Sequence, residues 1–122
     1  MSDEFLRMAR QEIQSEIDNL KKILLSCTND EQLYEESGNI EKHMHKIKGL
    51  APMMEQGKMG EFAKISDMLV KHISSHGVLD GSHDIILDAI KKMASLFDGQ
   101  TNINIDDFKK HVKSRYPGIF EL

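Results

Sequence analysis

Residues 40–54 read IEKHMHKIKGLAPMM. In an α-helix, side chains three and four positions apart share a face. With that spacing, one side of the stretch is apolar and consists of Ile40, Met44, Ile47, Ala51 and Met54. The opposite side carries Glu41, His45, Lys48, Gly49 and Pro52. We therefore expect a helix that packs its apolar side into a core and turns His45 toward solvent.

The same three- and four-residue spacing recurs on both sides of this stretch. It predicts helices over about residues 5–24, 31–54, 59–73, 82–97 and 104–116, with an interruption of the second helix near residues 37–39. Polar residues suited to N-caps precede them: Ser2 or Asp3, the run Thr28-Asn29-Asp30, Ser82, and Asn104 or Asp106. Short connections favour antiparallel neighbours. The expected fold class is all-α: an up-and-down bundle of about five helices with a four-helix core.

Length and composition limit the classes of function. A chain of 122 residues suits one domain, residues 1–122. A formal net charge of -4 argues against nucleic-acid binding. The single cysteine, Cys27, allows no internal disulfide. Because no apolar stretch is long enough to span a bilayer and the start of the chain lacks a signal-peptide pattern, we expect a cytoplasmic protein without membrane contact, and a monomer.

The polar side of residues 40–54 offers a nucleophile in a suitable setting. A neutral imidazole is well populated at neutral pH, since the reference pKa of histidine is about 6.5. Lys48 and Gly49 follow His45 by three and four positions. An ammonium there can offset phosphoryl charge, and a glycine leaves space for a partner, although it costs the helix roughly 1 kcal/mol. From spacing alone, a solvated His-Lys face remains the more common interpretation.

The run His45-Lys46-Ile47-Lys48-Gly49-Leu50-Ala51 resembles the phosphorylation-site signature of histidine-phosphotransfer domains. The similarity is strongest to the N-terminal phosphotransfer domain of chemotaxis histidine kinases, and it extends from about Phe5 to Phe97. It implies that His45 accepts a phosphoryl group, through Nε2, from a histidine kinase domain. A response-regulator receiver domain would then take the group onto an aspartate. The chain itself would bind no cofactor, because ATP and Mg²⁺ belong to the partners and the sequence has no nucleotide-binding pattern.

The resemblance also implies a carboxylate on the next helix, near the imidazole. Asp67 stands where the chemotaxis subtype has a glutamate, and Lys64 replaces a histidine three residues earlier. Lys64 could draw Asp67 away by an i,i+3 ion pair. Glu41, one turn before His45, is the next candidate for the partner of the ring.

Two positions depart from the family pattern. Glu55 stands where a glycine is usual, and Pro52 where a small residue is preferred. A proline inside a helix costs roughly 3 kcal/mol. We expect Pro52 to strain the helix near Lys48.

Two other functions remain open. One is a docking module that has lost phosphotransfer; a site distorted by Pro52, with His45 turned inward, would mark it. The other is a structural bundle or a histidine metal site built from His72, His76 and His83, although we expect no metal because real sites need three or four convergent ligands. We expect His43 to be a histidine at the edge of the core rather than a second phosphoacceptor.

Overall fold

In the computed structural model, which describes residues 2–120, the chain forms helices joined by short connections. The elements are α1 (Asp3–Leu25), α2 (Asp30–Glu35), α3 (Ser37–Leu50), the short 3-10 helix η1 (Ala51–Met54), α4 (Gly57–His76), α5 (Ser82–Phe97) and α6 (Ile105–Arg115). No strand occurs within these residues. The predicted all-α bundle is confirmed.

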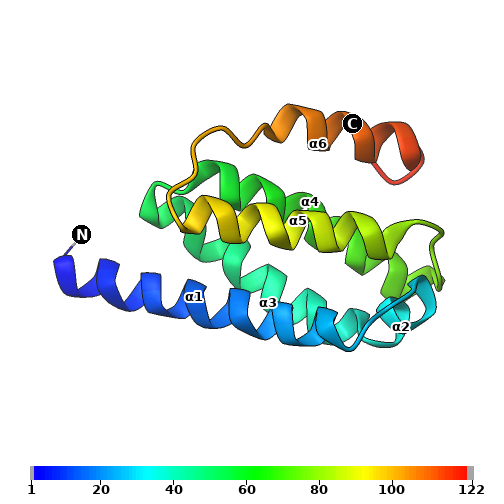
Figure 1. The fold of residues 1–122 in the computed structure, drawn as a ribbon, viewed down its shortest axis with the longest axis horizontal. Helices are drawn as coiled ribbons and strands as arrows, with labels where there is room; N and C mark the ends of the chain where they lie inside the picture. Colours follow the sequence, from blue (N-terminus) through cyan, green and yellow to red (C-terminus); the bar gives the residue numbers. More distant parts are fainter. Residues whose placement is uncertain (1, 121–122) are drawn as a thin grey trace.

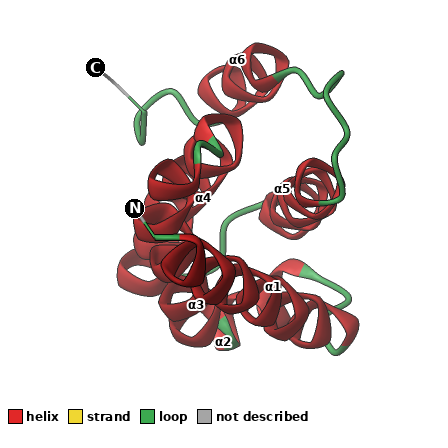
Figure 2. Ribbon diagram, turned by 90° about the vertical axis from the view of Figure 1, so that its left-hand side faces the viewer, coloured by secondary structure: helices red, strands yellow, loops and turns green. Residues whose placement is uncertain are grey.

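Four of the helices form the bundle. Along the chain, α1, α3, α4 and α5 run in alternating directions (Figure 1), and each packs on the next, with α5 closing back on α1. The short connections produce this antiparallel order. Viewed from its end in Figure 2, the bundle carries α6 on its outside, where α6 packs on α4.

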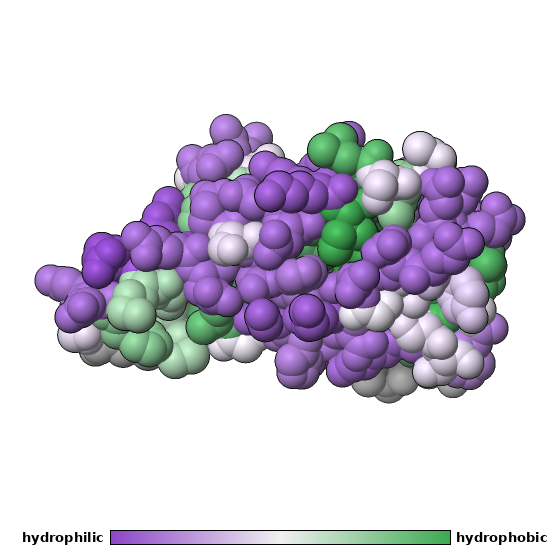
Figure 3. Space-filling view, turned by 90° about the horizontal axis from the view of Figure 1, so that it is seen from below, coloured by the Kyte–Doolittle hydropathy of each residue, from purple (hydrophilic) through white to green (hydrophobic). Residues whose placement is uncertain are grey.

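The apolar side chains that the helical spacing selects fill the interior. The largest fully buried ones are Ile13, Ile17, Leu20, Leu33, Ile40, Met44, Ile47, Met59, Phe62, Leu69, Ile73 and Ile86. The face seen in Figure 3 is mostly hydrophilic, with hydrophobic areas near its left end and right of its centre. No helix in residues 2–120 combines the length and the apolar character that crossing a membrane requires.

The helix predicted over residues 31–54 is divided, which corrects that prediction. Glu36, with φ -94° and ψ 4°, separates α2 from α3, close to the predicted interruption. The α-helix then ends at Leu50, and Pro52 lies in the first turn of η1, where proline is tolerated. The expected proline strain inside the helix is therefore absent. The Pro52 ring instead lies against Gly60 of α4, where a Cβ would be 3.4 Å from its Cγ and Cδ.

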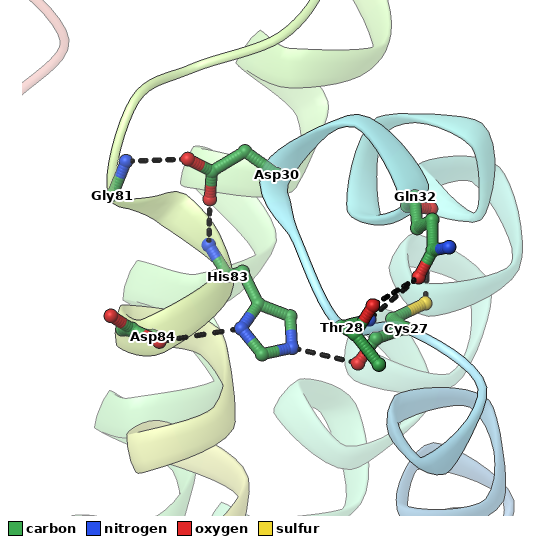
Figure 4. Close-up of polar contacts among 7 residues, drawn as sticks. All are labelled: Cys27, Thr28, Asp30, Gln32, Gly81, His83 and Asp84. Carbon is green, nitrogen blue, oxygen red and sulfur yellow. Dashed lines mark hydrogen bonds and ion pairs between the residues drawn. The ribbon is translucent and has the colours of Figure 1, made fainter.

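The start of α5 also differs from the prediction. Ser82 is its first residue rather than its cap, and its hydroxyl is buried without a hydrogen-bond partner in the described part of the chain. Figure 4 shows that Asp30 of α2 does the capping. Its carboxylate accepts hydrogen bonds from the backbone N–H groups of Gly81 (2.9 Å) and His83 (2.8 Å). The other expected caps form at Ser2, Asn29 and Asn104.

Candidate functional site

His45 lies on the exposed side of α3, as the helical spacing predicts. Its neighbours Met44 and Ile47 are buried, because the helix turns them into the core. The His45 side chain is 61% exposed. An approaching protein can therefore reach the imidazole without any rearrangement of the bundle.

Asp67 of α4 lies next to this imidazole. Its side chain is only 1% exposed, and its Oδ2 lies 3.5 Å from Nδ1 of His45. That distance is longer than an ordinary hydrogen bond, which agrees with the shorter reach of aspartate compared with glutamate. Within residues 2–120, the second oxygen, Oδ1, is buried without a hydrogen-bond partner.

Two lysines bind the same carboxylate oxygen. Nζ of Lys48 lies 3.0 Å from Asp67 Oδ2, and Nζ of Lys71 lies 3.1 Å from it. Lys48 comes from α3, so its ion pair with Asp67 joins α3 to α4 beside His45. Lys71 lies on α4 itself, one turn after Asp67. The imidazole and both ammonium groups converge on one oxygen.

The two lysines also decide the charge of Asp67. Burial by itself raises the pKa of the Asp67 carboxyl, since a charge is disfavoured away from water. Hydrogen bonds and attraction from Lys48 and Lys71 outweigh burial, and the pKa of Asp67 is lowered. The carboxylate is therefore ionised at neutral pH and able to act as a hydrogen-bond acceptor for the ring Nδ1–H.

Gly49 has open space around it. A Cβ built at this position meets no atom within 4 Å outside its own helix backbone and chain neighbours. The residue is exposed on α3, one turn beyond His45. The surface at this turn therefore has room for a partner.

The structure does not place Lys64 with Asp67. Lys64 is exposed and lines a groove between α4 and α6, together with Met68 and Lys113. The ion pair that Lys64 could make with Asp67 is not formed; the lysines on the carboxylate are Lys48 and Lys71. Glu41 is half-buried on α3 and forms no ion pair within residues 2–120.

Lys71 was not predicted from the sequence as a partner of Asp67. Its spacing from Asp67 is i,i+4, which is a recognised ion-pair spacing on a helix. That spacing was the available signal. Lys64 has the i,i+3 spacing but precedes the carboxylate, whereas an acid that precedes its base is the favoured order on a helix.

The histidines considered for a metal site make other contacts. The rings of His72 and His76 stack with centroids 4.1 Å apart. His83 Nε2 lies 2.8 Å from the backbone oxygen of Cys27 (Figure 4). In the part of the chain that the structure describes, no three histidine, cysteine or acidic side chains converge as metal ligands.

Comparison of the chain with models of protein families, with curated proteins and with solved structures finds no match.

Proposed function

We propose that the chain is a histidine-phosphotransfer domain with His45 as its phosphoacceptor. One observation carries the proposal: an exposed imidazole has its Nδ1 turned toward a buried carboxylate that two lysines hold ionised. A plain solvated helix face has no need of such a buried carboxylate. His45 points outward and Pro52 lies beyond the end of α3, so the features that would mark a docking module without chemistry are not found.

The carboxylate selects the reactive form of the ring. A neutral imidazole carries its proton on one nitrogen only. A negative oxygen beside Nδ1 favours the proton there and raises the basicity of the ring. The lone pair of Nε2 is then free to act as the nucleophile.

The transfer then takes place in two displacements. Nε2 attacks the γ-phosphorus of ATP held by a kinase domain, the bond to the leaving oxygen breaks, and ADP departs. A receiver aspartate next attacks the phosphorus, the N–P bond breaks, and its electron pair returns to Nε2. ATP and Mg²⁺ are bound by the partner proteins in both steps.

Lys48 and Lys71 supply positive charge on the side of the imidazole that faces Asp67. In the resting structure both ammonium groups neutralise Asp67. A phosphoryl group on Nε2 brings further negative charge close to them. Fixed charges already in place stabilise such a group without reorganisation.

The test is phosphoryl transfer from candidate histidine kinases and on to candidate receivers, with acid lability of the label as the signature of phosphohistidine. We expect His45→Gln to abolish labelling while the melting temperature stays nearly unchanged, because His45 is exposed. His111→Gln is the matched control, since His111 is an exposed histidine on α6. Kinase labelling that persists in His45→Gln would contradict the proposal.

The same assay tests Asp67. We expect Asp67→Asn to slow labelling of His45 modestly rather than abolish it, because the distance of 3.5 Å makes the contact weak. Ring nitrogen chemical shifts should show a smaller fraction of the Nδ1–H tautomer in the variant. Identical tautomer populations in both proteins would remove Asp67 from this role and leave Glu41 as the next residue to test.

A further inference from the structure

The other flank of α3 carries a second group of the same composition. His43 and Lys46 are three residues apart, as His45 and Lys48 are. Nδ1 of His43 pairs with Oε2 of Glu16 on α1, and Nζ of Lys46 lies 3.3 Å from Oε1 of the same carboxylate. The Glu16 side chain is only 4% exposed. α3 therefore presents a histidine, a lysine and a buried carboxylate from a neighbouring helix on two flanks.

The charge of Glu16 follows the same physics as that of Asp67. Burial raises the pKa of the Glu16 carboxyl, but hydrogen bonds and attraction from His43 and Lys46 outweigh it, so the pKa is lowered. The ionised carboxylate engages Nδ1 of His43 directly. A carboxylate in direct contact with Nδ1 favours the ring proton on that nitrogen.

His43 is at the edge of the core, as expected, yet one of its nitrogens remains available. The side chain is 15% exposed. Nε2 makes no hydrogen bond within residues 2–120, and it is not among the enclosed polar atoms that lack a partner. Nε2 is therefore not fully enclosed, and in the neutral ring that carries its proton on Nδ1 it keeps its lone pair.

Access to His43 is narrower than access to His45. The side chain of His45 is four times as exposed, and the residue four positions after it is Gly49. The corresponding residue after His43 is Ile47, which is fully buried. A small molecule can approach Nε2 of His43 where a folded domain has little room.

We propose that His43 is a second phosphoacceptor, selective for small phosphoryl donors such as phosphoramidates and acyl phosphates. The inference extends the proposed function, on which it rests for the idea that imidazoles of α3 carry phosphoryl groups. Nε2 attacks the phosphorus, the bond from phosphorus to the leaving nitrogen or oxygen breaks, and ammonia or a carboxylate departs. The ring retains its Nδ1 proton against Glu16, and Lys46 faces the added negative charge.

The test uses the intact protein and phosphoramidate at neutral pH, followed by mass spectrometry under alkaline conditions that preserve phosphohistidine. We expect His43 and His45 to be the two fastest-labelled positions in the wild-type chain, and each of His43→Gln and His45→Gln to lose one of them. The exposed His111 provides the internal reference for unassisted labelling. His43 should react at least severalfold faster than His111 despite its lower exposure.

Two further variants test whether Lys46 and Glu16 promote the labelling of His43. Lys46→Gln changes an exposed side chain, so the fold should be retained, and labelling of His43 should slow severalfold while that of His45 is unchanged. Glu16→Gln should slow labelling of His43 about tenfold, measured on protein that still melts cooperatively. Labelling of His43 no faster than that of His111, or equal rates in wild type and Lys46→Gln, would overturn the inference.

The outcome is separate from that of the proposed function. Label at His45 alone, from a kinase and from phosphoramidate, would support the phosphotransfer domain and refute the second acceptor. Label at His43 alone would support a phosphoacceptor at His43 and refute the assignment of His45. Kinase label on His45 with small-molecule label on both histidines would support the two proposals together.

Discussion

At the scale of single residues, Gly49 is the position at which access to His45 can be tested. No side chain fills the space around it. We expect Gly49→Leu to keep the fold and to stabilise α3 by up to roughly 1 kcal/mol, since glycine is a poor helix residue. The added side chain should nevertheless slow transfer between His45 and a receiver by at least tenfold, because it projects toward the approaching protein. Single-turnover transfer rates measure the effect.

The matched control is Gly38 in the same helix. It is also exposed, and a Cβ there also meets nothing within 4 Å. Gly38→Leu should stabilise α3 in the same way but leave the transfer rate unchanged, since it lies almost two turns before His45. Equal transfer rates in Gly49→Leu and wild type would show that the glycine does not provide access.

Glu55 is the residue at which the backbone is strained. Its φ of 59° lies in the left-handed region, and no other described residue apart from glycine has a positive φ. A side chain in that region destabilises the folded state by roughly 1–2 kcal/mol. A glycine removes this strain, but it also makes the unfolded chain more flexible, which offsets part of the gain in stability. We expect Glu55→Gly to raise the free energy of unfolding by up to about 1 kcal/mol in urea titrations. Gln56→Gly, at φ -100°, should lower it; a gain in both variants would mean that φ is not the cause.

At the scale of helices, the sequence predicted which side of each helix is buried better than it predicted which side chains meet between helices. The spacing within residues 40–54 was enough to predict that His45 is exposed while Met44 and Ile47 are buried, because both follow from the helical period. It could not determine that Lys48 of α3 binds the Asp67 carboxylate. That contact depends on how α4 is rotated against α3, which is a property of the packed pair and not of either segment.

The contribution of Asp67, at the contact between α3 and α4, to the free energy of unfolding should depend on pH. The folded pKa of Asp67 is lowered, so its stabilising effect is complete above the unfolded pKa of about 3.9 and disappears as the pH falls through the lower folded pKa. We expect Asp67→Asn to lower the free energy of unfolding by roughly 1–3 kcal/mol at pH 7. The difference from wild type should shrink below about pH 4, as denaturation at several pH values would measure.

The control for Asp67→Asn is an ion pair on α5 between Asp88 and Lys92, whose Nζ lies 2.8 Å from the carboxylate. Because both side chains are partly exposed, Asp88→Asn should change the free energy of unfolding by less than about 1 kcal/mol at any pH. An Asp67→Asn variant that behaves like Asp88→Asn would show that the buried carboxylate does not hold α3 to α4.

At the scale of the whole molecule, helical periodicity and short connections predicted the bundle, because both are properties of the chain read in order. The cap of α5 could not be predicted in the same way. Asp30 and His83 are 53 residues apart, and they meet only when α2 and α5 pack together. Ser82 was the nearest residue of a suitable type, and local reasoning selects the nearest one.

The position of α6 leads to a prediction about cooperativity. The helix lies outside the bundle on α4 and buries Phe108 and Val112 there. Its end is held by the hydroxyl of Tyr116, which donates to the backbone oxygen of Asp80 at 2.6 Å, and by Arg115, 2.6 Å from the Asp80 carboxylate. One packing surface and an exposed ion pair are weak anchors compared with the packing of α3 and α4, each of which contacts several other helices.

We therefore expect α6 to open before the four-helix core does. Native-state hydrogen exchange should give the amides of α6 a lower opening free energy than those of α3 and α4. Tyr116→Phe removes the hydrogen bond to Asp80 but keeps the ring, so it should lower the opening free energy of α6 by about 1 kcal/mol and leave the core amides unchanged. Phosphorylation of His45 should proceed at the wild-type rate in this variant, because α6 takes no part in the site. Equal opening free energies for α6, α3 and α4 would instead make all the helices one cooperative unit.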